Sequence, residues 1–164
     1  MPHISLRPDL FGITSLLDYR TETAEPLCEL THLLLRGAST LTEAERELIA
    51  TYVSYLNDCT FCQTAHGAAT CQLPGGSDEQ ITAVKKDLDS ASLSAKMHAL
   101  LHIARKVQKS GRSVKIEDVE AARQAGATDL EIHDTVLIAA LFCLYNRYVD
   151  GLATIAPTDP AFYE

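Results

Sequence analysis

Two cysteines, a histidine and a glutamate lie close together in the first half of the sequence. Cys59 and Cys62 form a Cys-x-x-Cys pair, His66 follows four residues after Cys62, and Glu47 lies twelve residues before Cys59. Thiols with an imidazole and a carboxylate can carry out redox chemistry that moves protons as well as electrons. These residue types predict a thiol-based peroxidase or a disulfide oxidoreductase.

The spacing of the three central residues fits one face of a helix. If the chain is helical from Cys59, then Cys59, Cys62 and His66 are neighbours, because residues three and four apart lie side by side on a helix. His66 would then have access to the Cys62 sulfur. A nearby imidazole, a helix N-terminus and a Cys-x-x-Cys arrangement each lower a thiol pKa, so this segment favours a thiolate.

Glu47 can reach this group only if the chain reverses direction. On one unbroken helix its 15-residue separation from Cys62 would correspond to about 22 Å, which is too far for proton transfer. Asn57 and Asp58 predict a break, because both side chains compete for backbone hydrogen bonds and cap new helices well. A turn there would allow Glu47 to orient His66, directly or through water.

Glu47 also has an interpretation that involves no chemistry. Together with Glu43 and Glu45 it could form a solvated acidic start to a helix, which the helix macrodipole favours. Spacing alone does not decide between a buried partner of His66 and an exposed carboxylate.

The cysteine pair could instead bind zinc or only fill space. A zinc site needs two further ligands, and the chain has no second Cys-x-x-Cys motif. His66 and Cys71 follow on the same helical stretch, where their geometry for zinc would be poor. Buried free cysteines also behave as small hydrophobic side chains. We favour redox chemistry and expect neither a metal nor a cofactor.

The other cysteines and histidines give weaker signals. Cys28 and Cys143 fall on expected apolar faces, where most cysteines fill space. His98 and His102 have the i, i+4 spacing of two metal ligands, but no further ligand lies near them in the sequence. We therefore expect packed or hydrogen-bonded histidines at these two positions.

Composition and charge limit the classes of protein. With 164 residues the chain predicts a single domain over 1–164. Its net charge of −8 disfavours nucleic acid and anionic membranes as partners. The start of the sequence does not resemble a secretory signal, so a cytoplasmic protein is expected. An odd count of five cysteines argues against a structural disulfide framework.

Hydrophobic spacing is helical along almost the whole chain, so we predict an all-α fold of about seven helices. Thr42 with Glu45 and Thr128 with Glu131 form two capping boxes, each of which marks a helix start. Besides a short helix within residues 1–22, the expected helices are 24–36, 42–56, 59–72, 77–88, 92–110, 116–125 and one from 128 onward.

The last expected helix is apolar on nearly all sides, in the segment VLIAALFCLYNRYVDGLA. Such a helix should be buried in the protomer or in a subunit interface. Its polar residues Asn146, Arg147 and Asp150 are expected to satisfy buried backbone groups or a partner subunit, not to act on substrate.

Taken together, the residues Glu47, Cys59, Cys62 and His66 in an ERELIA…CxxCxxxH context resemble the alkylhydroperoxidase D-like (AhpD-like) family of the carboxymuconolactone decarboxylase superfamily. The similarity is greatest to its shorter, peroxidase-related branch, and it extends to the apolar NRYVDGL segment. This resemblance implies an all-helical fold, assembly into homo-oligomers and peroxidase activity at the cysteine pair.

The resemblance also implies a role for each site residue. Cys62 would attack the hydroperoxide, Cys59 would resolve the sulfenic acid into a disulfide, and Glu47 with His66 would form a proton relay. A dithiol or lipoyl-type partner would reduce the disulfide again. The decarboxylases of the superfamily lack the thiol pair, so lactone decarboxylation is not expected.

One residue departs from the family pattern. Phe61 stands where members with peroxidase activity often carry a second histidine, so the relay is shorter here. This departure leaves open a general disulfide oxidoreductase. A third alternative is a non-catalytic oligomeric stress-response module.

Overall fold

The computed structural model describes residues 1–163, and within this range it contains helices and no strands. The α-helices are α1 (Gly12–Tyr19), α2 (Thr21–Arg36), α3 (Glu43–Leu56), α4 (Thr60–Gln72), α5 (Asp78–Lys86), α6 (Ala95–Lys109), α7 (Ile116–Gln124) and α8 (Asp129–Gly151). Three short 3-10 helices are η1 (Leu88–Ser90), η2 (Gly111–Ser113) and η3 (Pro160–Phe162). The all-α prediction is confirmed, with eight α-helices in place of about seven; Glu164 lies outside the described residues.

Side-chain caps set several of the helix starts. In α3 the Thr42 hydroxyl accepts a hydrogen bond from the Glu45 amide (3.2 Å), and Glu45 accepts one from the Thr42 amide (2.8 Å). Thr128 and Glu131 form the same reciprocal pair at the start of α8. Both predicted capping boxes are therefore confirmed. The sixth helix begins later than predicted because Ser94 caps it.

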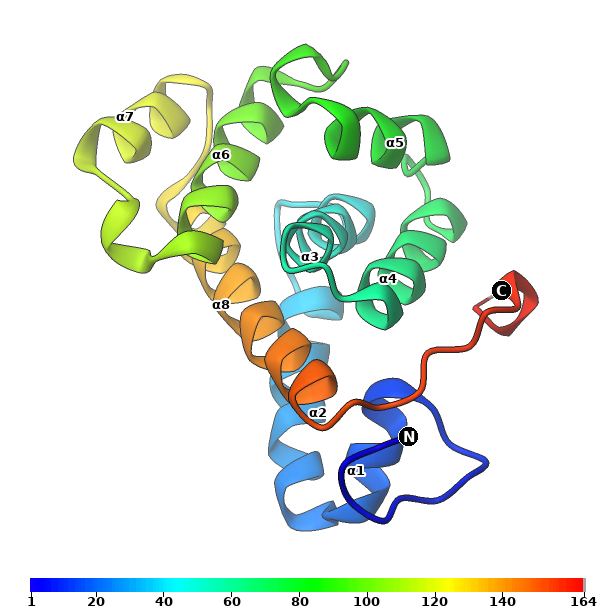
Figure 1. Ribbon diagram of the computed structural model, residues 1–164. Helices are drawn as coiled ribbons and strands as arrows, with labels where there is room; N and C mark the ends of the chain where they lie inside the picture. Colours follow the sequence, from blue (N-terminus) through cyan, green and yellow to red (C-terminus); the bar gives the residue numbers. More distant parts are fainter. Residues whose placement is uncertain (164) are drawn as a thin grey trace.

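The third helix, α3, forms the centre of the molecule. Figure 1 shows α4, α5, α6 and α8 arranged around it, and α3 packs against each of them. Most residues of α3 are buried, including the charged Arg46 and Glu47. Arg46 donates to the backbone oxygens of Leu34 and Gly37. Every polar side chain on this helix needs such a partner, since burial without one is costly.

The chain reverses between α3 and α4 at the predicted place. Asp58 has a φ of 58°, a left-handed conformation that Asp tolerates better than most residues. The predicted cap is wrong in detail: Cys59 is the N-cap residue and lies just outside α4. The Asn57 side chain instead donates to the Asn146 oxygen at 2.8 Å. Helix α4 therefore runs back along α3.

A second, smaller apolar cluster surrounds the cysteine pair. It contains Leu16, Phe61 and Val149 together with Cys59 and Cys62. The two ends of the chain pack against this cluster, and Figure 1 shows the segment after α8 passing from that helix towards α4. Backbone hydrogen bonds from His3 to Leu152 and from Gly12 to Ile155 hold the two ends together.

The last helix, α8, is buried on one side only. Ile138 and Phe142 pack into the main core, whereas Leu130 and Leu144 are 56% and 45% exposed. The protomer therefore buries only part of this helix, and burial of its exposed side in a subunit interface, the other predicted alternative, stays a prediction. Among residues 1–163 the helices are too short or too polar to cross a bilayer.

Gly12 should be intolerant of any side chain. Its φ is +50°, and a Cβ atom there would lie 2.3 Å from the ring of Phe61. We expect Gly12→Ala to lower the free energy of unfolding by about 2–4 kcal/mol, from backbone strain and overpacking together. Urea unfolding measures this. Gly111→Ala, where a Cβ meets open space, is the control and should change it by less than about 0.5 kcal/mol.

Candidate active site

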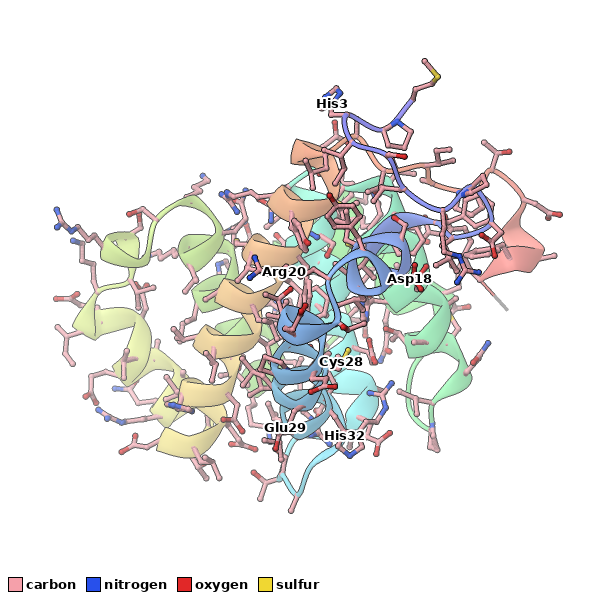
Figure 2. All side chains as sticks on the ribbon, turned by 90° about the horizontal axis from the view of Figure 1, so that it is seen from below. His3, Asp18, Arg20, Cys28, Glu29 and His32 are labelled. Atoms are coloured by element: carbon pink, nitrogen blue, oxygen red, sulfur yellow. The ribbon has the colours of Figure 1, made fainter. Side chains whose placement is uncertain are left out.

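A cavity of about 360 Å³ lies between α1, α2, α3, α4 and α8. Its walls are largely apolar, and its polar lining residues include Cys62, Glu47, His66 and Arg36. Figure 2 looks at the molecule from the side of α1 and α2, with the lining residues Cys28 and His32 labelled on α2. Cys59 is not a lining residue, so the two cysteines of the pair differ in their access to the cavity.

Glu47 and His66 are hydrogen-bonded to each other. His66 Nδ1 lies 2.6 Å from Glu47 Oε2, and the Glu47 side chain is only 2% exposed. The reversal at Asp58 makes this contact by laying α4 along α3. A solvated Glu47, the alternative considered from the sequence, is therefore wrong.

Arg36 is a third member of this group, which the sequence did not indicate. Arg36 Nη2 donates to Glu47 Oε1 at 2.5 Å, so each carboxylate oxygen of Glu47 has its own partner. Arg36 is the last residue of α2, eleven positions before Glu47, and no motif connects the two. A basic residue in the last turn of a helix is usually explained by its favourable interaction with the helix dipole. The sequence therefore provides no reason to expect that Arg36 also pairs with Glu47.

The two partners decide the charge of Glu47. Burial acts to raise the pKa of Glu47, but the hydrogen bonds and charges of His66 and Arg36 outweigh it and hold the pKa below its ordinary value. An ionised Glu47 can only accept hydrogen bonds, so His66 Nδ1 must donate. When the imidazole is neutral, its lone pair therefore lies on Nε2, where it can act as a base.

The two cysteines of the pair are unequal. Both are buried and unbridged. A hydrogen bond from Cys59 and another from Asn146 outweigh burial and lower the pKa of Cys62. The same interaction with Cys62, together with burial, raises the pKa of Cys59. Cys62 is also the third residue of α4, where free backbone amides favour a negative charge.

His66 and Cys62 line the same cavity, but within residues 1–163 the structure shows no hydrogen bond between them. Contrary to the expectation from the sequence, the lowered pKa of Cys62 comes from Cys59 and Asn146 and not from His66. A proton moving between Cys62 and His66 must therefore cross through water or substrate.

Asn146 has a larger part in the site than the sequence suggested. Its amide donates to Ser54 Oγ at 3.0 Å, accepts from Asn57 and hydrogen bonds with Cys62. All of these partners are side chains, so the expected role in satisfying buried backbone groups is wrong. The one feature of the sequence that could have indicated this role is the amide side chain of Asn146 within the apolar last helix.

The remaining candidates lie apart from this group. His98 Nε2 bonds with the Ala91 oxygen, and His102 pairs with Asp89, as the hydrogen-bonded interpretation predicts. Cys28 is exposed, so its expected burial is wrong. Within the described chain, no three His, Cys, Asp or Glu side chains are arranged to hold a metal ion.

Comparison with known proteins places this geometry in context. The model of the carboxymuconolactone decarboxylase family matches residues 21–106, a segment that contains Glu47, both cysteines of the pair and His66. A search of curated proteins finds no match.

Three solved structures are similar over most of the chain. A peroxidase-related protein from Silicibacter sp. TM1040 is 27% identical, with a TM-score of 0.81, covering 89% of this chain and 76% of that one. An AhpD-core, peroxidase-related protein from Ralstonia eutropha JMP134 is 26% identical, with a TM-score of 0.83 and coverages of 92% and 79%. Both of these proteins are uncharacterized.

The third structure supports the fold alone. It is a protein of unknown function from Agrobacterium tumefaciens, with a proposed role as the antioxidant defence protein AhpD. It is 18% identical with a TM-score of 0.75, and the match covers 97% of this chain and all of the other.

Removing Arg36 should leave a buried carboxylate with one partner too few. A carboxyl whose folded pKa lies below its unfolded value, about 4.3, stabilises the fold above that pH and loses this contribution as the pH falls further. We expect Arg36→Met to raise the pKa of Glu47 and to lower the free energy of unfolding by about 1–3 kcal/mol at pH 7.

The difference from wild type should narrow between pH 7 and pH 4, because protonation removes the unpaired charge in the variant. Urea unfolding across this range measures the effect. Arg123→Met breaks exposed ion pairs and serves as the control, with an expected change below about 0.5 kcal/mol. A pH-independent loss for Arg36→Met would contradict the assignment of charge to Glu47.

Proposed function

The chain belongs to the carboxymuconolactone decarboxylase family, in its AhpD-like group, and from this membership and the site geometry we propose that it is a thiol-dependent peroxidase. One observation carries the proposal most directly. Cys62, whose pKa is lowered, lines the same cavity as the hydrogen-bonded Glu47–His66 pair. A nucleophile and a base oriented by a third group are the parts that covalent catalysis needs.

The first step oxidises Cys62. Its proton passes to His66 through the cavity, and the thiolate attacks the terminal oxygen of a hydroperoxide. The O–O bond breaks, Cys62 becomes a sulfenic acid, and the alkoxide that leaves takes the proton from His66 to form an alcohol. The ionised Glu47 stabilises the imidazolium between these two transfers.

The second step uses Cys59. Its sulfur attacks the sulfenic sulfur, so that a Cys59–Cys62 disulfide forms and water leaves. The start of α4 favours this step because it brings the two sulfurs into contact. A dithiol or lipoyl-type reductant then restores both thiols. We place this cycle in a reducing compartment, the cytoplasm.

The walls of the cavity favour an organic hydroperoxide over hydrogen peroxide. Ile13, Leu17, Leu35 and Phe142 offer apolar surface for an alkyl or aryl group, with Cys62 and His66 in the same cavity. Phe61 also lines the cavity. Where relatives often carry a histidine, this chain therefore has an aromatic ring that adds apolar surface to the wall.

A general disulfide oxidoreductase is the second candidate. Phe61 and the missing hydrogen bond between His66 and Cys62 favour it, because disulfide exchange needs less proton transfer than peroxide reduction. We do not favour a non-catalytic stress-response module, since such a protein has no use for a lowered thiol pKa at Cys62.

We also propose that the chain forms a homo-oligomer through the exposed face of α8. Leu130, Leu137 and Leu144 lie seven residues apart on this helix, so they form one stripe. The outer two are largely exposed. A second copy of the chain could cover this stripe.

Replacing Cys62 should abolish peroxide consumption. With cumene hydroperoxide and a dithiol reductant, we expect Cys62→Ser to lower the rate at least a thousandfold, because the variant lacks the thiol whose pKa is lowered and which lines the cavity with the Glu47–His66 pair. Cys59→Ser should consume one equivalent and stop as a sulfenic acid, which dimedone traps and mass spectrometry detects.

Cys71→Ser is the matched control, since Cys71 is exposed and does not line this cavity. Its rate should stay within about twofold of wild type. If wild-type protein reduced small disulfides much faster than any hydroperoxide, the oxidoreductase alternative would replace the peroxidase.

A charge within the apolar stripe of α8 should prevent assembly. We expect Leu144→Glu to shift the mass measured by light scattering from an oligomer towards the 17.9 kDa protomer. Ile155→Glu, at an exposed apolar residue outside the helix, is the control and should leave the mass unchanged. A monomeric wild-type protein would contradict the proposal of a homo-oligomer.

A further inference from the structure

The two cysteines of the pair differ in their access to the surface, since Cys59 is wholly buried. Cys62 lines the apolar cavity, whereas Cys59 does not. A separate depression of about 400 Å³ is lined by Asn57, Asn146, Arg147, Asp150 and Gly151, and it shares no lining residue with the cavity. It is polar and open to solvent.

Asp150 connects this depression to the cysteine pair. It lies in the last turn of α8, directly after Val149, which packs against Cys59 in the smaller apolar cluster. The two groups act on each other: a hydrogen bond with the Cys59 thiol acts to lower the pKa of the Asp150 carboxyl, and the charge of Asp150 acts to raise the pKa of Cys59. Asp150 itself is exposed, so one side of its carboxylate reaches the buried thiol and the other reaches water.

Few other charges act on Asp150. Asp58, in the turn before α4, is the nearest like charge, and desolvation with Asp58 keeps the pKa of Asp150 above its ordinary value despite the Cys59 hydrogen bond. Arg147 lines the same depression, but its Nη1 donates to the Cys143 backbone oxygen. Within residues 1–163 no ion pair ties up the Asp150 carboxylate, so it is free to take a proton.

Cys59 needs a proton acceptor of its own. It must lose its proton to attack Cys62, yet burial and the neighbouring Cys62 sulfur both raise its pKa. Both oxygens of Glu47 are occupied by Arg36 and His66. The relay at Glu47 therefore serves Cys62 on the cavity side and leaves Cys59 without a base.

We propose that Asp150 is a catalytic residue, the general base that accepts the Cys59 proton when the disulfide forms. This inference rests on the proposed function and adds a second proton path to it. Cys59 attacks the Cys62 sulfenic acid, the S–O bond breaks, and the S–S bond forms. The Cys59 proton passes to Asp150, which releases it through the depression to solvent. The leaving hydroxide is neutralised in solvent by the proton that Asp150 releases, so the net product is one water molecule.

A test of Asp150 need not depend on peroxide. Cys62 attacks 2,2′-dithiodipyridine, releasing one thiopyridone and leaving a mixed disulfide. Cys59 then resolves this bond and releases a second thiopyridone, again losing a proton. Stopped-flow absorbance follows both phases in a background in which the exposed Cys28 and Cys71 are serine, and Cys59→Ser identifies the second phase by its absence.

We expect Asp150→Asn to slow the second phase at least tenfold, in line with the usual contribution of a general base, and to leave the first phase within about twofold. Asp58→Asn removes a carboxylate that acts on Asp150 but is not among the groups that shift the pKa of Cys59, and asparagine tolerates the same left-handed backbone. This control should keep both phases near the wild-type rates. An unchanged second phase in Asp150→Asn would overturn the proposal.

Chemical rescue separates catalysis from a structural role. In Asp150→Ala, formate added to the buffer can enter the open depression, and it should raise the rate of the second phase in proportion to its concentration. A slow second phase that formate does not raise would show that Asp150 only supports the fold, and would also overturn the proposal.

The Asp150→Asn variant can also be tested with a hydroperoxide, which examines the proposed peroxidase function separately from the role of Asp150. After one equivalent of cumene hydroperoxide, Asp150→Asn should accumulate the Cys62 sulfenic acid that wild-type protein converts rapidly to the disulfide. If wild-type Cys62 does not react with hydroperoxides, the peroxidase proposal fails. The thiopyridone phases still decide the role of Asp150 in that event.

Discussion

A carboxylate inside the central helix is the constraint on which the site depends. Glu47 is almost wholly buried on α3, and a buried charge is tolerated only when it is paired and hydrogen-bonded. Arg36 at the end of α2 and His66 on α4 meet this requirement, one at each oxygen. The same two contacts join three helices, so the pairing that keeps Glu47 charged also positions the cavity.

Asymmetry between the two sulfurs follows from the turn that precedes α4. The left-handed Asp58 lets α4 start at once after α3, with Cys59 as its N-cap and Cys62 in its first turn. Cys62 thereby gains helix amides, Asn146 and access to the cavity, whereas Cys59 lies deeper, against α8. A nucleophile and a resolving thiol with different surroundings result from a single change of chain direction.

The sequence by itself determined the helices and the chemistry available to them. Helical spacing and the capping boxes at Thr42 and Thr128 predicted nearly every helix, because these signals are local and depend on neighbours within one or two turns. The same locality made Cys59, Cys62 and His66 recognisable as a group. The break at Asn57 and Asp58 was also predictable, since turn preference belongs to the residues themselves.

Only the tertiary structure decided which distant side chains complete the site. These side chains are Arg36 on α2 and Asn146 and Asp150 on α8. Their local sequence does not indicate that each will contact a carboxylate or a thiol on another element. Exposure of one face of α8 was likewise hidden, because an apolar composition does not say which face the core will cover. Packing of helices far apart in the chain sets these contacts, and they outweigh the effect of burial, so that the pKa values of Glu47 and Cys62 are lowered.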